Sequence, residues 1–260
     1  MQTLTDRVAL VTGASRGIGA GLARVFHRRG LKLALCARSE ADAGEIPNDA
    51  ERIFYRKVDV TDFEALALFA RDAEARLGPI DLWVNNAGLL EPIGPVRGAS
   101  PDAVRRHVEV NVLGVFHGMR VYLDLLHGAQ RTGTVVNISS GAGVHPFEGW
   151  GVYCAGKAAV DMLTRVSALE EHAHGIRLFA LAPGVIATGM QELIRRQDAK
   201  DFPDVDRFRD LHSSGQLGHA ESPAPAILRL AFGDPLPPES VVLDVRSSPE
   251  LQDLGAFAGV

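Results

Sequence analysis

The sequence predicts an α/β fold: a single-domain, doubly wound parallel sheet with helices on both faces. Three observations support this prediction. Short apolar runs of strand length alternate with longer helical stretches, the first run leads directly into a glycine-rich turn, and the 260 residues contain no internal repeat or low-complexity linker. Alternating strands and helices favour a parallel sheet, and right-handed crossovers place helices on both of its faces. A chain of this length can bury one substantial core.

The expected strands are apolar runs that end in a turn, beginning with Val8-Ala9-Leu10-Val11. Runs that are apolar on both faces are typical of parallel sheets. The apolar runs predict strands over residues 8–11, 31–37, 53–60, 80–84, 134–138, 176–181 and 241–245. The intervening stretches predict helices over residues 18–29, 61–77, 100–126, 152–174 and 224–232. Thr61 and Glu64 have the spacing of a capping box for the second of these helices.

Other segments lie outside this pattern. Residues 39–49 predict a surface loop or a short helix, and residues 185–222 are polar and interrupted by Gly, Pro and Asp. We expect the domain to span residues 1–246, with residues 185–222 as its substrate-loop region. Residues 247–260 are expected to form a C-terminal tail that can be mobile.

Charge and cysteine content narrow the functional classes. The formal net charge is −5, whereas nucleic-acid-binding proteins usually present a basic face. Cys36 and Cys154 are too few for a disulfide framework, so a reducing compartment is the simpler interpretation. The sequence shows no signal-type apolar segment near residue 1 and no run of about 18 apolar residues. We therefore expect a cytoplasmic protein that binds neither nucleic acid nor membrane.

The turn after the first strand reads Thr12-Gly13-Ala14-Ser15-Arg16-Gly17-Ile18-Gly19. Its glycines allow a tight turn and a close approach of the backbone to a pyrophosphate. The following helix offers free N–H groups and the positive end of its dipole to an anion. A glycine-rich turn can also occur without a ligand, but this one lies between a strand and a helix, the context in which dinucleotides bind.

The end of the second strand indicates which dinucleotide binds. Sites for NAD usually place an acidic residue there to hold the ribose 2′-hydroxyl, whereas this strand ends in Cys36-Ala37-Arg38. The guanidinium groups of Arg38 and Arg16 suit a 2′-phosphate, unless both are simply solvated. Glu40 is a nearby carboxylate that could oppose a phosphate. We expect NADP(H) as the cofactor and no metal ion, because the cofactor itself carries the hydride.

A second group of residues points to proton transfer. Tyr153 and Lys157 lie four residues apart in a predicted helix, so their side chains share one face. A nearby ammonium group can lower the tyrosine pKa from about 10 and help it to exchange a proton with a carbonyl. Ser139 and Ser140 end a strand at the sheet edge where ligands bind, and a hydroxyl there can stabilise charge on a substrate oxygen. Asn111 lies within a predicted helix, where a buried amide needs partners.

These motifs, in this order, resemble the short-chain dehydrogenase/reductase family over nearly the whole chain. The resemblance rests on the glycine turn, Asp59, Asn85-Asn86-Ala87-Gly88, Asn111, the paired serines, Tyr153 with Lys157, and Pro183-Gly184. It implies a Rossmann fold and an oxidoreductase.

The resemblance also implies a role for each matching residue. Tyr153 would be the general acid/base, and Lys157 would hold the nicotinamide ribose and lower the tyrosine pKa. Ser140 would orient the carbonyl, and Asn111 would support a water that connects Lys157 to solvent. The implied cofactor contacts are Gly13, Ser15, Arg16, Gly17, Ile18, Gly19, Arg38, Asp59, Val60, Asn86, Ala87, Gly88, Tyr153, Lys157, Pro183, Gly184, Val185 and Thr188.

The substrate end carries weaker signals. Residues 183–191 and Val242-Leu243-Asp244 resemble the sepiapterin reductase and benzil reductase branch of the family. By this resemblance Asp244 would meet a polar substrate group, although a solvated acid at a strand end is an equal alternative. The expected cavity wall is apolar, which suits an aromatic or bulky ketone or a vicinal dicarbonyl. Its expected members are Leu89, Val144, His145, Phe147, Trp150 and Met190, with Trp150, Met190 and Asp244 as the substrate contacts.

The sequence therefore predicts an NADPH-dependent carbonyl reductase. A 3-oxoacyl-thioester reductase, or another alcohol dehydrogenase of the family, shares every motif. A non-enzymatic NADP sensor would have no chemical need for Ser140, Tyr153, Lys157 and Asn111 together. The resemblance also implies a homodimer or homotetramer built on the helix that contains Tyr153 and the long helix before it.

Overall fold

A parallel sheet of seven strands forms the centre of the protein. In the computed structural model, which describes residues 4–42 and 44–258, the strand order is β3-β2-β1-β4-β5-β6-β7 and every neighbouring pair is parallel. The expected doubly wound sheet is confirmed, with its switch point between β1 and β4. The strands are β1 (Val8–Thr12), β2 (Lys32–Ala37), β3 (Ile53–Lys57), β4 (Ile80–Asn85), β5 (Thr134–Ile138), β6 (Arg177–Ala182) and β7 (Val242–Asp244).

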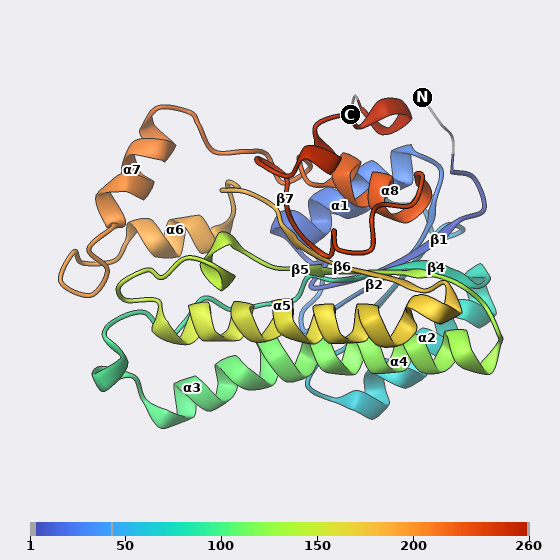
Figure 1. The fold of residues 1–260 in the computed structure, drawn as a ribbon, viewed down its shortest axis with the longest axis horizontal. Helices are drawn as coiled ribbons and strands as arrows, with labels where there is room; N and C mark the ends of the chain where they lie inside the picture. Colours follow the sequence, from blue (N-terminus) through green and yellow to red (C-terminus); the bar gives the residue numbers. More distant parts are fainter. Residues whose placement is uncertain (1–3, 43, 259–260) are drawn as a thin grey trace.

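Helices cover both faces of this sheet (Figure 1). The covering helices are α1 (Gly17–Arg28) and α8 (Ala224–Phe232) on one face, and α2 (Phe63–Leu77), α4 (Gly114–Gly128) and α5 (Gly151–Glu171) on the other. Strand β1 is buried throughout: Ala9 and Val11 pack with α1 and α8, whereas Val8 and Leu10 pack with the other group. Since successive strand side chains point to opposite faces, a strand covered on both faces is apolar at every position.

The remaining helical elements lie between these strands and helices along the chain or follow β7. They are η1 (Val96–Gly98), α3 (Pro101–Val108), η2 (Glu109–Leu113), η3 (Gly141–Gly143), η4 (His172–His174), α6 (Gly189–Arg195), α7 (Val205–Ser213), η5 (Pro249–Leu251) and η6 (Gly255–Phe257). No helix in the described ranges is both long and apolar enough to cross a bilayer.

The long helix expected over residues 100–126 is interrupted. Its middle, η2, is a π-helical turn that contains Asn111 and separates α3 from α4. A π-turn is an insertion into the regular hydrogen-bond ladder and is frequent at functional sites. The expected strand over residues 53–60 is also shorter and ends at Lys57.

The capping box expected at the start of α2 is wrong. The N-cap is Asp62, whose carboxylate accepts a hydrogen bond from the Ala65 amide at 3.0 Å. The Thr61 hydroxyl instead donates to Asp59 at 2.9 Å. Thr61 is therefore held outside the helix by a carboxylate two residues before it.

The segment over residues 185–222 is more ordered than its polar composition suggests, because it contains α6 and α7. The expected domain boundary at residue 246 and the mobility of the tail stay predictions. Leu251 and Phe257 of that tail are buried in the core beside α1 and α8, and Arg29 donates a hydrogen bond to the Phe257 carbonyl at 2.9 Å. Residues 1–3, residue 43 of the 39–49 loop, and residues 259–260 of the tail lie outside the described residues.

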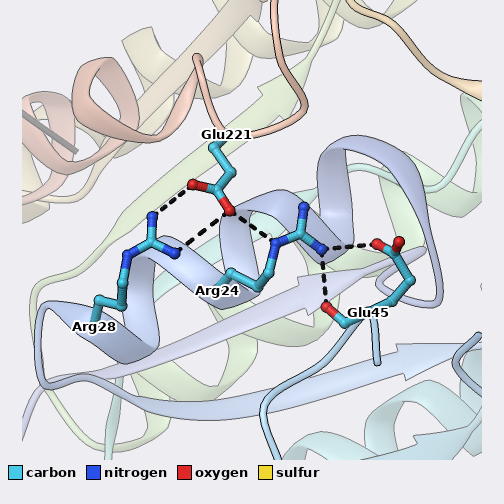
Figure 2. Close-up of polar contacts among 4 residues, drawn as sticks. All are labelled: Arg24, Arg28, Glu45 and Glu221. Carbon is cyan, nitrogen blue, oxygen red and sulfur yellow. Dashed lines mark hydrogen bonds and ion pairs between the residues drawn. The ribbon is translucent and has the colours of Figure 1, made fainter. Parts of the chain in front are cut away.

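A network of ion pairs fastens two loops to α1 (Figure 2). Glu221, just before α8, accepts from Arg24 Nε at 2.8 Å and from Arg28 Nη2 at 2.5 Å. Arg24 also donates to Glu45 in the segment between β2 and β3, at 2.7 Å. The backbone approaches closely here, since a Cβ on Gly21 would lie 2.3 Å from the Ala220 carbonyl oxygen. The network thus holds the segment between β2 and β3 and the segment before α8 against α1.

Candidate active site

One large cavity of about 930 Å³ opens at the carboxyl ends of the strands, where ligands bind in open parallel sheets. It brings together most of the residues that the sequence singles out, from segments far apart in the chain. Its wall includes Gly13, Ser15, Arg16, Gly17, Ile18, Arg38, Asp59, Val60, Asn86, Ala87, Gly88, Ser140, Trp150, Tyr153, Lys157, Pro183, Gly184, Val185, Thr188 and Met190. Gly19, Asn111 and Asp244 are not part of this wall.

The glycine turn is fastened to the end of β4. Gly13 and Gly17 have φ angles of +66° and +57°, which favour glycine. The Asn86 amide donates to the carbonyl oxygens of Thr12 and Gly13, at 2.9 and 3.1 Å. Gly19 is needed for packing rather than as a wall residue, because a Cβ there would lie 2.4 Å from the Gly13 carbonyl oxygen.

The two arginines expected to bind a 2′-phosphate both line this end of the cavity. Within residues 4–42 and 44–258, neither Arg16 nor Arg38 takes part in an ion pair with a carboxylate. Glu40, the carboxylate that could oppose a phosphate, instead lies 3.2 Å from the Lys57 ammonium group. The donors present therefore fit a phosphorylated ribose.

Asp59 lines the same end of the cavity as the two arginines and accepts hydrogen bonds from Thr61 and Arg106. Although burial opposes the shift, hydrogen bonds from Thr61 and Arg106 lower the pKa of Asp59. The carboxylate is therefore ionised and held in place at neutral pH, where it can accept a hydrogen bond from a ligand.

Ser140, Tyr153 and Lys157 converge on the cavity from two elements. Ser140 follows β5, and its hydroxyl accepts a hydrogen bond from the Ala142 amide at 3.2 Å. Tyr153 and Lys157 lie one turn apart on α5, and each side chain is only 7% exposed. The Lys157 Nζ lies 5.7 Å from the centre of the Tyr153 ring and donates to the Ile138 carbonyl at 2.7 Å.

Burial dominates the acid–base behaviour of this pair. It raises the pKa of Tyr153 to about 12, against an opposing hydrogen bond with Ser140. Burial also lowers the pKa of Lys157 to about 8, and the charge of Asp161 opposes that shift. The expected lowering of the tyrosine pKa is thus outweighed by desolvation of the phenolate. At neutral pH Tyr153 carries its proton.

Asn111 lies behind the wall and organises the segment after β4. Its side-chain Oδ1 accepts from the Leu89 amide, and its Nδ2 donates to the Leu89 carbonyl, both at 2.7 Å. The same Nδ2 lies 2.9 Å from Nε2 of His107, whose Nδ1 is 2.7 Å from the Glu91 carbonyl oxygen. Since Nδ1 must donate to that carbonyl, Nε2 accepts from the asparagine. The water expected beside Asn111 stays a prediction.

This geometry agrees with a comparison of the chain to known families. The model of the family described as short chain dehydrogenase matches residues 7–199. The chain belongs to the short chain dehydrogenase family. A relative is the benzil reductase ((S)-benzoin forming) of Bacillus subtilis, 30% identical over 223 residues, which cover 85% of this chain and 91% of the relative.

Solved structures of this family share the fold. The KRED1-Pglu enzyme superposes with a TM-score of 0.81 at 32% identity, covering 91% of this chain and 99% of that one. A structure described as ElxO with NADP bound has a TM-score of 0.78 at 28% identity, covering 92% of this chain and 96% of the other.

The end of the cavity beside Trp150, where the sequence predicts substrate contacts, is aromatic and apolar. Trp150 stacks on Phe202, with ring centres 4.6 Å apart and an angle of 7°, and meets the Tyr153 ring edge at 5.7 Å. Phe208 completes the cluster at 5.4 Å from Trp150. Of the other expected wall residues, Val144 is exposed and lies outside the wall. Leu89, His145, Phe147 and Met190 all line it.

Asp244 is paired with Arg246, and its expected contact with substrate stays a prediction. Its two carboxylate oxygens accept from Arg246, at 2.7 and 3.0 Å, and Arg246 itself lines the cavity. Burial favours the protonated carboxyl, yet the hydrogen bonds and charge of Arg246 hold the pKa of Asp244 below its usual value. Arg246, rather than Asp244, therefore contributes to the cavity wall.

Two buried groups near the short chain dehydrogenase motifs were not predicted from sequence. His107 is fully buried and orients Asn111, and Asp161 is 6% exposed and lies near Lys157. The available signals were spacings of four residues, from His107 to Asn111 and from Lys157 to Asp161, which place each pair on one helix face.

A group of possible metal ligands lies at the C-terminal ends of α4 and α5, apart from the cavity wall. It consists of His127, Glu171 and His174. His127 Nε2 is 2.7 Å from a Glu171 carboxylate oxygen, so a hydrogen bond accounts for the contact.

Proposed function

We propose that this protein is an NADPH-dependent carbonyl reductase that acts on a ketone or vicinal dicarbonyl with a bulky or aromatic substituent. One observation carries the proposal: Ser140, Tyr153 and Lys157 line the same cavity as the glycine turn and as Arg16 and Arg38, which have no carboxylate partner among the described residues. A hydride carrier and a proton donor can therefore meet at one carbonyl.

NADPH fits the residues of the dinucleotide end. The glycine turn and the N-terminus of α1 would receive the pyrophosphate, and Arg16 with Arg38 would receive the 2′-phosphate. The related ElxO structure, which holds NADP, supports this choice. When bound, the cofactor supplies the hydride.

The protein's own residues handle the carbonyl oxygen. The Ser140 hydroxyl donates a hydrogen bond to that oxygen, and Tyr153 donates the proton that the new alcohol requires. The high tyrosine pKa keeps this proton in place until charge develops on the substrate, which favours reduction. Lys157 places a positive charge beside the phenol as its proton leaves.

Trp150 and Phe208 line the cavity, with Phe202 packed behind them, and these aromatic rings support a flat or bulky substrate. Rigid aromatic walls bury large apolar area with little loss of side-chain freedom. The benzil reductase relative is consistent with such a substrate. Reduction of 3-oxoacyl thioesters on a carrier protein would favour a basic entrance, whereas Glu192 and Asp204 stand in the wall with Arg207 and Arg246.

Self-association is the second part of the proposal. Large apolar side chains are exposed on α3, η2, α4 and α5. They are Val108, Leu113, Phe116, Met162, Val166 and Leu169. An exposed apolar face of this kind is typical of a protein interface. We therefore propose a homodimer or homotetramer through these helices. The cytoplasmic location stays a prediction.

The test follows NADPH oxidation against benzil, 1-phenyl-1,2-propanedione, sepiapterin and acetoacetyl thioester, with Tyr153→Phe as the matched variant. We expect turnover of a dicarbonyl, lowered about 10²–10⁴-fold in the variant because the proton donor is lost. NADPH binding, measured by its fluorescence, should be retained. A substrate that the variant reduces as fast as the wild type would contradict the role of Tyr153. Turnover of the thioester alone would favour the acyl-thioester alternative.

A further inference from the structure

Asp161 is a buried carboxylate that is only half satisfied. It lies on α5 with 6% of its surface exposed. One oxygen, Oδ1, accepts a hydrogen bond from the Ser139 hydroxyl at 2.5 Å. The other, Oδ2, has no hydrogen-bond partner among the described residues. A buried carboxylate with an unpaired oxygen is costly, so its presence calls for a physical reason.

The surroundings of Asp161 tie it to the proton-transfer residues. It follows Lys157 by four residues, so both side chains lie on one face of α5. Its partner Ser139 directly precedes Ser140. Gly143 leaves room for it, because a Cβ on that glycine would lie 2.4 Å from Oδ2 and 3.2 Å from the Lys157 carbonyl oxygen. Strand β5, the η3 turn and α5 therefore meet around this carboxylate.

We propose that Asp161 is a positioning residue whose buried negative charge keeps Lys157 in its ammonium form and thereby sets the upper pH limit of catalysis. The proposal rests on the carbonyl-reductase function, in which Tyr153 must release a proton beside a charged Lys157. Asp161 does not touch the cavity and acts only through the lysine.

The electrostatics of the two groups agree with this assignment. Burial lowers the pKa of Lys157 to about 8, and Asp161 is the charge that opposes this shift. Burial raises the pKa of Asp161, and the Ser139 hydrogen bond, Lys157 and Arg165 all oppose it. Each group thus stabilises the charged form of the other in a dry environment, where such coupling is strong.

The other titratable groups near Lys157 do not replace this charge. Tyr153 is protonated at neutral pH, because burial raises its pKa to about 12. Burial lowers the pKa of His107, which packs edge-on against the Tyr153 ring, so it is neutral where Lys157 titrates. The positive charge of Arg165 acts on Asp161, where it favours the ionised carboxylate. Within the described residues, Asp161 is therefore the one negative charge acting on Lys157.

The sign of the expected effect follows. Removing a negative charge destabilises the ammonium form of Lys157, so its pKa falls below about 8. Lys157 then loses its positive charge at lower pH, which moves the alkaline loss of carbonyl reduction to lower pH.

The test replaces Asp161 with asparagine, which keeps the shape and the bond from Ser139. The first readout needs neither cofactor nor substrate: the pH dependence of Lys157 acetylation by acetic anhydride, followed by peptide mass spectrometry. We expect its midpoint to fall by about one pH unit in Asp161→Asn. The second readout is the pH profile of kcat for benzil reduction, whose alkaline limb should shift by the same amount. An unchanged Lys157 midpoint in a folded variant would overturn the proposal.

Two further variants sharpen the test. Asp124→Asn removes an exposed carboxylate of α4 that pairs with Arg120, and it should leave the Lys157 midpoint unchanged. Ser139→Ala keeps Asp161 but removes the hydrogen bond that its Oδ1 accepts, so it should shift the Lys157 midpoint in the same direction by a smaller amount. This variant serves if Asp161→Asn does not fold. If no carbonyl is reduced by the wild type, the proposed function fails, while the acetylation midpoint still decides the coupling.

Discussion

The charge at position 38 offers the most direct test of cofactor preference. Arg38 is exposed at the end of β2, lines the cavity and has no carboxylate partner among the described residues. The Glu40 carboxylate instead forms an ion pair with Lys57, whose Nζ lies 3.2 Å from Glu40 Oε1. Arg38→Asp removes a donor for the 2′-phosphate and places a negative charge in its position. The carboxylate can also accept from a ribose 2′-hydroxyl.

The magnitude can be estimated in two steps. A hydrogen bond to a charged group contributes about 1.5–3 kcal/mol, and exposure favours the lower value. A carboxylate about 4 Å from one phosphate charge adds about 1 kcal/mol of repulsion in a water-like medium. The sum, about 2.5–3 kcal/mol, corresponds to a roughly 100-fold fall in the preference for NADPH over NADH.

The assay compares kcat/KM for NADPH and for NADH with one carbonyl substrate, and the dissociation constants of both nucleotides by fluorescence. Arg105→Asp is the matched control, since Arg105 is an exposed arginine of α3 that pairs with Asp102. It should leave the NADPH/NADH ratio unchanged. If Arg38→Asp also changes the ratio by less than about two-fold, the 2′-phosphate does not meet Arg38 and the assignment of NADP fails.

Three further outcomes are expected. Gly19→Ala should destabilise the glycine turn by about 1–3 kcal/mol and weaken NADPH binding, because its Cβ would lie 2.4 Å from a backbone oxygen. Gly98→Ala is the control, since a Cβ there meets nothing within 4 Å. Equal stability in urea and equal NADPH affinity of the two variants would contradict this reasoning. Glu221→Gln should lower the free energy of unfolding by about 1 kcal/mol near neutral pH relative to Glu239→Gln, by weakening the network of Figure 2. Arg28 and Arg24 lower the pKa of Glu221 in the folded protein, so the stability difference is present above pH about 4.3 and should disappear as the pH falls through that lower pKa. A stability difference that persists in acid would contradict an ionic origin. Leu169→Glu, at a side chain that is 79% exposed, should convert a dimer or tetramer to monomers in sedimentation experiments, and an unchanged mass would exclude this face as the interface.

Several features of the site follow from local sequence because their physical causes are local. The glycines at positions 13 and 17 are needed for backbone angles that other residues rarely adopt, and both angles are present. Tyr153 and Lys157 share a helix face because a spacing of four residues is only slightly more than one helical turn. Such short-range geometry survives into the folded protein whatever packs around it.

Other features were invisible at that level. Asn111 lies in a π-turn, and Asp62 rather than Thr61 caps α2. Both features depend on which hydrogen-bond partners surround each polar group in the folded protein. The sequence left open whether Asp244 meets a substrate, and in the structure both of its carboxylate oxygens accept hydrogen bonds from Arg246, two residues later. A sequence pattern predicts which groups are available, whereas hydrogen-bond competition decides which of them are used.

The sequence by itself determined the α/β class, the succession of strands and helices, the glycine turn and the residues that gather at the carboxyl edge of the sheet. Strand alternation, helix periodicity and glycine backbone angles are short-range properties, so they can be recognised without coordinates. Only the tertiary structure decided the direction of the Tyr153 pKa shift and the hydrogen bond between His107 and Asn111. It also decided that one oxygen of Asp161 is buried without a hydrogen-bond partner among the described residues. Each of these depends on burial and on contacts between segments far apart in the chain, because the free energy of a charge is set by the solvent and the partners that the fold leaves around it.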